Sequence, residues 1–417
     1  MSLGNYITYR SPGPELTVAD ILREYWAEYK EVYPVTPQQA KVVGSIMACR
    51  TPQLGGRLDQ CQECGAWVFG FKSCRDRHCN QGQKYERAKW VEKQKVMLLP
   101  IPYFHIVFTT DHALNPLISQ NQRAFYDLLF QTVKRALQEF AAEKLGCELG
   151  ITMVLHTWGQ KLDQHVHIHC IVTGGGLALA GSRWVRLINK RYLFDVVELS
   201  AAYRDDLLEA IRDQYRKGKW ELSGPAAEMD VEAVLAELEA KKWEVFAKPF
   251  SNPEVVYEYL SRYVHQMAIS NYRLVKLEVG EVTFRYYENK ERAEAGGKGK
   301  EKEMALPVLE FIRRLMQHVL PPHFHRIRYC GLHSSSARKE KLPRVRKLLG
   351  LDRALPEVEE LDLTEWLQEI LGDEVDRCPN CGAKGSLFER TSFDKLPWLV
   401  VLILSLCGQP TRQGVCR

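Results

Sequence analysis

Residues 151–173 read ITMVLHTWGQKLDQHVHIHCIVT, and this stretch decides the expected fold. Residues 151–158 and 165–173 are two runs rich in β-branched and aromatic residues, and the polar link GQKLDQ separates them. Two such runs joined by a short polar connection predict an antiparallel β-hairpin. Glycines at positions 174–176 end the second run.

Three histidines occupy alternate positions in the second run. His165, His167 and His169 are separated by the apolar Val166 and Ile168. Successive side chains of a strand point to opposite faces, so the three imidazoles are expected on one face. Neutral imidazole is the commonest nitrogen ligand of metals. The pattern therefore favours a metal site over a merely polar strand face.

The metal site requires a further ligand beside His167 and His169. Gln160, at the start of the polar link, and His156, on the partner strand, are the nearest candidates in sequence, and Asp163 is a third choice. Periodicity does not rank them. Alternatively, Gln160 stabilises the turn and His156 is a core histidine with backbone partners.

A pair of tyrosines lies farther along the chain, in YEYLSRYVHQMAISN. Residues 253–270 have the pattern of a helix, and Tyr259 and Tyr263 stand four residues apart, which places both phenols on one helix face. A phenol can attack a phosphodiester when a metal polarises the phosphate. Such a pair alone more often packs in a core, so only the histidine motif favours a catalytic role.

Cysteines cluster upstream of the hairpin. Cys61 and Cys64 form a C-x-x-C pair, followed by Cys74 and Cys79, with His78 as an alternative ligand. This spacing predicts a structural zinc site, which small modules need in order to fold. Basic residues around it predict a DNA-binding face. They are Arg75, Arg77, Lys84, Arg87 and Lys89.

The composition is that of a folded protein with more than one domain. The 417 residues are 45% hydrophobic and 26% charged. The net charge is only +5, but residues 71–95 carry eight Lys or Arg against three acids, and residues 290–347 carry fifteen against six. This asymmetry suits phosphate backbones, although solvated helix faces would also explain either stretch.

The N-terminus has no secretory signal pattern, so we expect a cytoplasmic protein with reduced cysteines. The longest apolar run, residues 396–407, is shorter than the ~20 residues that span a membrane. We therefore expect no membrane association.

Several motifs together resemble the rolling-circle transposases of the insertion sequence 91 family. They are CRTPQLGG from Cys49, SCRDRHC from Ser73, LPIPYFHIVFTT from Leu99, LHTWGQKLDQHVHIHCIVTGGG from Leu155 and YLSRYVHQMAISN from Tyr259. They occur in the family's order, and only their combination is specific.

The resemblance implies an α+β fold. It comprises a His-hydrophobic-His (HUH) endonuclease domain, with an antiparallel sheet and helices, preceded by a small helical zinc-binding domain. His167 and His169 match the metal motif, and Tyr259 and Tyr263 match the paired tyrosines, with Arg262 between them as a further DNA contact. The implied cofactors are zinc in the N-terminal domain and magnesium or manganese at the nuclease site.

The chain departs from the family's usual pattern at Gly82, where another cysteine is usual. Zinc would then use Cys61, Cys64 and Cys79, with Cys74 or His78 as the fourth ligand. Near the C-terminus, Cys378 and Cys381 form a lone C-x-x-C pair. Cys330, Cys407 or Cys416 could complete a second site there, but we expect no metal at this pair.

The expected activity is nicking and joining of single-stranded DNA at transposon ends and target sites, through a 5′-phosphotyrosine intermediate. A homo-oligomer and host replication machinery are further expected partners. The alternatives are a replication initiator or relaxase-like nickase, a decayed zinc-dependent DNA-binding protein, and a zinc hydrolase that uses His165, His167 and His169 with water. Only the nickases form a covalent protein–DNA product.

The expected domains are a zinc-binding DNA-binding domain over residues 1–100, a catalytic domain over residues 101–292 and a basic region over residues 306–417. Residues 293–303, AEAGGKGKEKE, have the composition of a linker or exposed loop.

Overall fold

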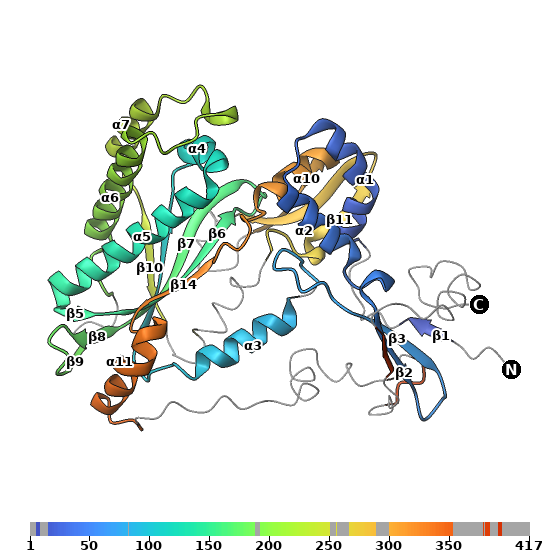
Figure 1. The fold of residues 1–417 in the computed structure, drawn as a ribbon, viewed down its shortest axis with the longest axis horizontal. Coiled ribbons are helices and arrows are strands. Elements are labelled where there is room, and N and C mark those ends of the chain that lie inside the picture. Colours follow the sequence, from blue (N-terminus) through green and yellow to red (C-terminus); the bar gives the residue numbers. More distant parts are fainter. Residues whose placement is uncertain are drawn as a thin grey trace. The chain divides into compact units, whose positions relative to one another are not determined.

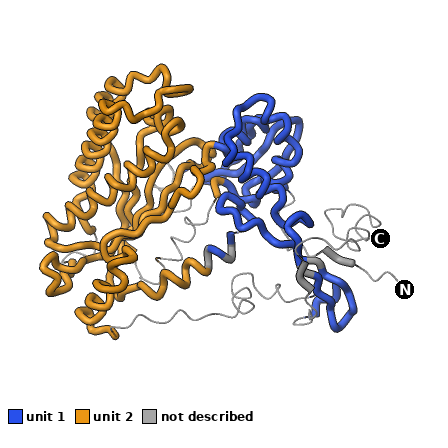
Figure 2. Tube along the Cα trace, in the orientation of Figure 1, with its two compact units in different colours: residues 1–86, 269–316, 359–417 blue, residues 87–268, 317–358 orange. Residues whose placement is uncertain are grey.

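The computed structural model describes residues 6–8, 16–81, 83–187, 192–250, 256, 267–288, 300–352, 378, 380–383 and 391–393. The chain forms two compact units, each built from separate stretches (Figure 2). Unit 1 comprises residues 1–86, 269–316 and 359–417, and unit 2 comprises residues 87–268 and 317–358. These units do not coincide with the three consecutive segments expected from the sequence, which assumed that each domain is continuous.

Unit 2 is built on a five-stranded antiparallel sheet with the order β10-β4-β7-β6-β14 (Figure 1). The expected hairpin is its centre: β6 (Gly150–Trp158) pairs with β7 (Gln164–Thr173). Around it lie β4 (Tyr103–Thr109), β10 (Val245–Pro249) and β14 (Ile327–Gly331). A small sheet of β5 (Cys147–Glu148), β8 (Gly175–Ala178) and β9 (Trp184–Arg186) belongs to the same unit.

Helices cover one face of this sheet. They are α4 (Asn115–Gln120), α5 (Gln122–Phe140), α6 (Val196–Arg216) and α7 (Val231–Ala240). Alternate strand residues such as Phe104, Phe108 and Ile168 face them and are fully buried with Phe125 and Leu207. Each such side chain contributes about 1.5–3 kcal/mol by burial, so this face is the main core of unit 2.

The opposite face carries a second apolar cluster. Val154 of β6 and Ile171 of β7 are buried in it with Leu342 and Val345 of α11 (Ser335–Leu348). Val256 is buried in the same cluster and has helical backbone. The basic helix α3 (Lys84–Lys95) precedes the unit's first strand.

Unit 1 includes two N-terminal helices, a three-stranded sheet and one further helix. They are α1 (Val18–Val32), α2 (Pro37–Ala48), the sheet of β11 (Leu274–Glu278), β12 (Glu281–Glu288) and β13 (Lys300–Pro307), and α10 (Val308–Gln317). Thr17 and Thr36 each close a capping box, which explains where α1 and α2 begin. Val18 donates its backbone N–H to Asn271, 253 residues away, so this unit assembles from distant stretches.

The prediction of a linker or loop over residues 293–303 is wrong at its C-terminal end. Residues from Lys300 onward form β13, which pairs with β12 in a register that sets Glu288 opposite Lys300. Arg285 forms ion pairs with Glu301 and Glu303. Alternating charges therefore serve as cross-strand partners here, although their composition resembles that of a loop. Residues 293–299 lie outside the described residues.

A second sheet of unit 1 joins the two ends of the chain. Its order is β1-β3-β2-β15, from β1 (Tyr6–Thr8), β2 (Gly56–Gln60), β3 (Trp67–Phe71) and β15 (Thr391–Phe393). Strand β15 pairs antiparallel with β2, with Thr391 opposite Leu58. The C-terminal region thus contributes a strand to the N-terminal sheet.

The prediction of an α+β fold on an antiparallel sheet is confirmed by these elements. Among the described helices, none has the length and apolar character needed to cross a bilayer. The apolar run at residues 396–407 lies outside the described part of the chain.

Candidate functional site

Strand β7 projects its three histidines from the sheet face opposite the helices. Val166 and Ile168, which alternate with them, are fully buried in the main core. Because the core fixes which face these two residues occupy, it also fixes the face of His165, His167 and His169. The predicted grouping of the imidazoles follows directly from this alternation.

His156 joins two of these histidines from the neighbouring strand. It lies opposite His167 in the register of β6 and β7, and its ring centroid is 4.6 Å from that of His169. One ring nitrogen each of His156, His167 and His169 can be chosen so that all lie within 4.8 Å of one another. We call these three residues the histidine trio.

The remaining candidate ligands are not members of the trio, and of these His165 is close to it, with its ring centroid 4.9 Å from that of His167. His165 Nδ1 is 3.4 Å from Nε2 of His112, so its ring pairs with another histidine. Gln160 is exposed in the turn between the strands, and Asp163 ends that turn, accepting the Gly159 N–H with its backbone carbonyl. The structure therefore brings His156 next to His167 and His169, whereas Gln160 is exposed in the turn.

The Nδ1 atoms of two trio members have partners that orient the rings. His167 Nδ1 lies 2.8 Å from the backbone oxygen of His165, and His169 Nδ1 lies 2.8 Å from Nε2 of His105. The carbonyl oxygen requires His167 Nδ1 to donate, which leaves Nε2 with its lone pair. Metal-bound histidines usually show this arrangement, with the second nitrogen held by an outer partner.

Burial keeps these imidazoles neutral. Desolvation lowers the pKa of His105 to about 4 and that of His167 to about 3, and it lowers the pKa of His169 as well. Neighbouring histidines act in the same direction on His167 and His169. A neutral imidazole offers a lone pair to a cation, so the trio has the donor chemistry of a divalent metal site.

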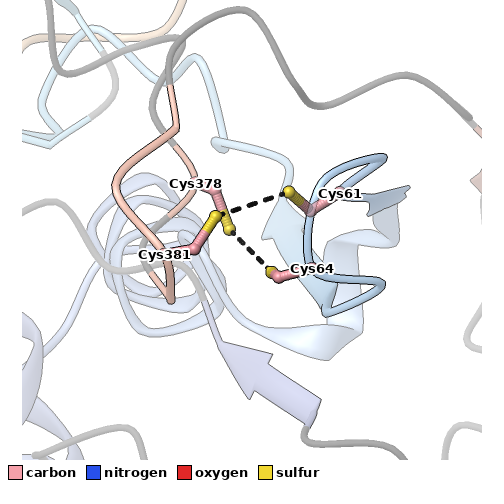
Figure 3. Close-up of side chains that lie close together, drawn as sticks. All are labelled: Cys61, Cys64, Cys378 and Cys381. Atoms are coloured by element: carbon pink, nitrogen blue, oxygen red, sulfur yellow. Dashed lines mark hydrogen bonds between the residues drawn. The ribbon is translucent and has the colours of Figure 1, made fainter.

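In the described part of the chain, cysteines form two clusters, neither of which is the set expected from the sequence. Figure 3 shows the first group, in which Cys61 and Cys64 meet Cys378 and Cys381. The Sγ atoms of Cys61 and Cys381 are 3.8 Å apart, and those of Cys64 and Cys378 are 3.7 Å apart. The C-terminal pair is thus not alone, in contrast to our sequence-based expectation.

The second group consists of Cys49, Cys74 and Cys79, whose sulfurs lie within 4.8 Å of one another. A hydrogen bond from the Cys74 thiol holds the pKa of Cys49 at about 3, and the same contact raises the pKa of Cys74 to about 11. His78 is not a member of this group, and its Nδ1 lies 3.0 Å from the Asp76 carboxylate.

Sequence reasoning missed how the cysteines combine, although one signal was present. Both C-x-x-C pairs continue as C-x-x-C-G-A, in Cys61–Ala66 and again in Cys378–Ala383. It also missed His105, which strand β4 places beside His169. Cys330, a suggested partner of the C-terminal pair, is instead buried in the core of unit 2.

The predicted DNA-binding residues are only partly described. Arg75 is exposed in unit 1, Arg77 is half-buried there, and Lys89 is exposed on α3 in unit 2. The backbone of α3 includes Lys84 and Arg87, whose side chains lie outside the description. The other predicted site residues outside the described part of the chain are Gly82, Tyr259, Arg262, Tyr263, Cys407 and Cys416.

Two family models match regions of the chain that contain the histidine trio and the N-terminal cysteines. Residues 150–341 match the family model "Putative transposase", and residues 21–110 match the model "Transposase zinc-binding domain". The first range includes the histidine trio, and the second includes Cys61 and Cys64. Cys378 and Cys381 lie outside both ranges.

Two curated relatives align with most of the chain. "Putative transposase y4qJ" of Sinorhizobium fredii (strain NBRC 101917 / NGR234) is 38% identical over 381 residues, which cover 88% of this chain and 93% of the relative. "Transposase for insertion sequence element IS801" of Pseudomonas savastanoi pv. phaseolicola is 27% identical over 369 residues, which cover 86% and 85%.

Proposed function

Because this chain belongs to the insertion sequence 91 family of transposases, we propose that it nicks and joins single-stranded DNA with a tyrosine nucleophile beside the histidine trio. The observation that carries the proposal is the trio itself. Three imidazoles from two adjacent strands converge, and Nδ1 of His167 and of His169 has an orienting partner. Structural histidines rarely need such an arrangement, whereas metal ligands do.

His156, His167 and His169 would hold a divalent cation. Manganese suits imidazole better than magnesium does, although magnesium remains compatible with added water and phosphate ligands. When bound, the cation polarises the scissile phosphate and offsets its developing charge. The strands supply rigid positions for the ligands, so little reorganisation accompanies the reaction.

Val256 connects the proposed tyrosine nucleophiles with the histidine trio, because it precedes them in sequence and is buried on the trio's side of the sheet. It is helical and buried in one cluster with Val154 and Ile171, and β-pairing sets Val154 opposite His169. Tyr259 and Tyr263 follow Val256 by three and seven residues, which is one face of the helix that the sequence predicts over residues 253–270. The predicted helix therefore includes one residue, Val256, that is buried on the trio's side of the sheet.

The proposed reaction conserves the phosphodiester linkage. A tyrosine oxygen bonds to the phosphorus as its own proton leaves, the bond from phosphorus to the 3′ oxygen breaks, and that oxygen takes up a proton. The products are a 5′-phosphotyrosine and a free 3′ hydroxyl. Attack of a 3′ hydroxyl on the phosphotyrosine reverses these steps and joins strands, while the second tyrosine cuts another site.

In the cell, this reaction would occur at transposon ends and target sites in cytoplasmic DNA. Host replication machinery would extend the free 3′ hydroxyl, as rolling-circle transposition requires. The exposed basic residues Arg75 and Lys89 are available for backbone phosphates. Two copies of the chain could act on the two ends of the element.

A replication initiator or relaxase would share this chemistry, so the DNA target distinguishes it from a transposase. The substrate is therefore single-stranded DNA carrying the end of the element that encodes the protein. The protein is incubated with a labelled strand and Mn²⁺, and products are separated under denaturing conditions. We expect a protein–DNA adduct that is absent with scrambled DNA.

Variants distinguish a tyrosine nickase from a zinc hydrolase and from a decayed DNA-binding protein. The Tyr259→Phe/Tyr263→Phe double variant should form no adduct, whereas Tyr272→Phe, at an exposed tyrosine of unit 1, should form as much as the wild type. A water-dependent zinc hydrolase would cleave DNA without any adduct. A decayed DNA-binding protein would bind the strand without cleaving it, and either result would contradict the proposal.

A further inference from the structure

We propose that Cys61, Cys64, Cys378 and Cys381 form one four-thiolate zinc site, so that the C-terminal region completes the N-terminal zinc-binding domain. The matched zinc-binding range ends at residue 110 and supplies only two of these ligands. The other two follow more than 310 residues later, yet all four sulfurs lie within 4.8 Å of one another.

The two C-x-x-C turns are built in the same way. In the first, Gly65 N–H donates to Cys61 O and Cys61 N–H donates to Ala66 O; in the second, Gly382 N–H donates to Cys378 O and Cys378 N–H donates to Ala383 O. Both glycines have left-handed backbone, with φ of 69° and 74°. The sequence C-x-x-C-G-A therefore produces two matching turns, each presenting two sulfurs.

The spacing of the sulfurs fits a tetrahedral zinc ion. A Zn–S bond of about 2.3 Å implies S···S edges of about 3.8 Å in a regular tetrahedron. The contacts that join the two turns are 3.8 Å for Cys61 and Cys381 and 3.7 Å for Cys64 and Cys378 (Figure 3). These distances are far longer than the roughly 2.05 Å of a disulfide, so the four thiols are reduced and grouped.

Neighbouring groups support the same assignment. Asn380, in the second turn, has its Nδ2 atom 3.5 Å from Sγ of Cys64 in the first turn. An outer hydrogen-bond donor of this kind is typical of a thiolate that binds a metal. Beyond the cysteines, β15 of the C-terminal region also pairs with β2 of the N-terminal region. Four thiolates in a closed tetrahedron select zinc as a structural ion.

Zinc stoichiometry of the full-length chain tests this site. Cys61→Ser/Cys64→Ser and Cys378→Ser/Cys381→Ser should each contain one zinc ion fewer than the wild type, and the quadruple variant should also contain only one fewer. Cys147→Ala/Cys330→Ala, at buried core cysteines of unit 2, should contain as much zinc as the wild type. Unchanged zinc after loss of the C-terminal pair, or a loss of two ions in the quadruple variant, would overturn the proposal.

A second measurement avoids any folding defect of the variants, because it uses the wild-type protein. Cys64 and Cys381 are exposed, so burial does not protect their thiols from alkylation. A shared zinc ion would protect both, and a chelator should make both reactive at the same concentration, as peptide mass spectrometry would show. Rapid alkylation of Cys381 in the zinc-loaded protein, with Cys64 still protected, would contradict a shared site.

Discussion

The Nε2 atom of His105 lies 2.8 Å from Nδ1 of His169, and the two rings are stacked at 5.1 Å with an interplanar angle of 3°. If Nε2 of His169 binds a metal, its Nδ1 carries the proton and donates to His105. His105 would then act as a positioning residue that fixes the tautomer and orientation of a ligand without touching the metal.

Replacing His105 by Phe should weaken Mn²⁺ binding about 10- to 100-fold, because the ring contact remains but the acceptor is lost. His105→Gln retains an acceptor and should recover part of the affinity. Calorimetric titration with Mn²⁺ measures both effects, with His325→Phe, at an exposed histidine, as the control. Equal affinities in the Phe and Gln variants would show that His105 has only a packing role.

The identity of the third ligand gives a second prediction. His156→Ala should abolish Mn²⁺ binding and DNA nicking, since it removes one of three converging nitrogens. Gln160→Ala should leave both near wild-type values, because Gln160 is exposed in the turn. Metal titration and the nicking assay check the pair of variants together. The reverse result, with Gln160 essential and His156 dispensable, would assign the ligand to the turn.

The buried histidines predict how stability depends on pH. Desolvation lowers the pKa of His105 and His318 to about 4 and that of His333 to about 3. Below about pH 6.5 the unfolded chain binds protons that the native state does not, so the free energy of unfolding falls as the pH drops toward 4. Each histidine contributes a slope of up to about 1.4 kcal/mol per pH unit.

Urea denaturation of the metal-free protein between pH 7 and pH 4.5 measures this slope. His318→Gln should reduce it, because one buried titrating group is removed, even if the variant is less stable throughout. An identical slope in His318→Gln and the wild type would contradict this account, because it would mean that His318 binds protons equally in the native and unfolded states.

Local patterns in the sequence were sufficient to predict the centre of the fold. The hairpin of β6 and β7 follows from two β-rich runs and a short link, and the common face of His167 and His169 follows from strand alternation. The approach of His156 to these two histidines depends on the strand register, which sets His156 opposite His167. Register depends on packing against the core, which periodicity alone does not reveal.

Long-range associations could not be predicted in this way. Cys61 and Cys378 come together from distant parts of the chain, and nothing in their local spacing excludes other combinations. Their spacing led to grouping Cys61 and Cys64 with Cys74 and Cys79 instead. Similarly, His105 neighbours His169 only because β4 pairs with β7, a connection that strand patterns do not specify.

The central claim is that a tyrosine following Val256 becomes covalently joined to DNA beside the histidine trio. Mass spectrometry of the proteolysed adduct, formed with single-stranded DNA of the element's end and Mn²⁺, tests it most directly. We predict that the nucleotide is attached to Tyr259 or Tyr263, and that the attachment moves between them in the single Phe variants. Attachment at any other residue, or cleavage without attachment, would contradict the proposed mechanism.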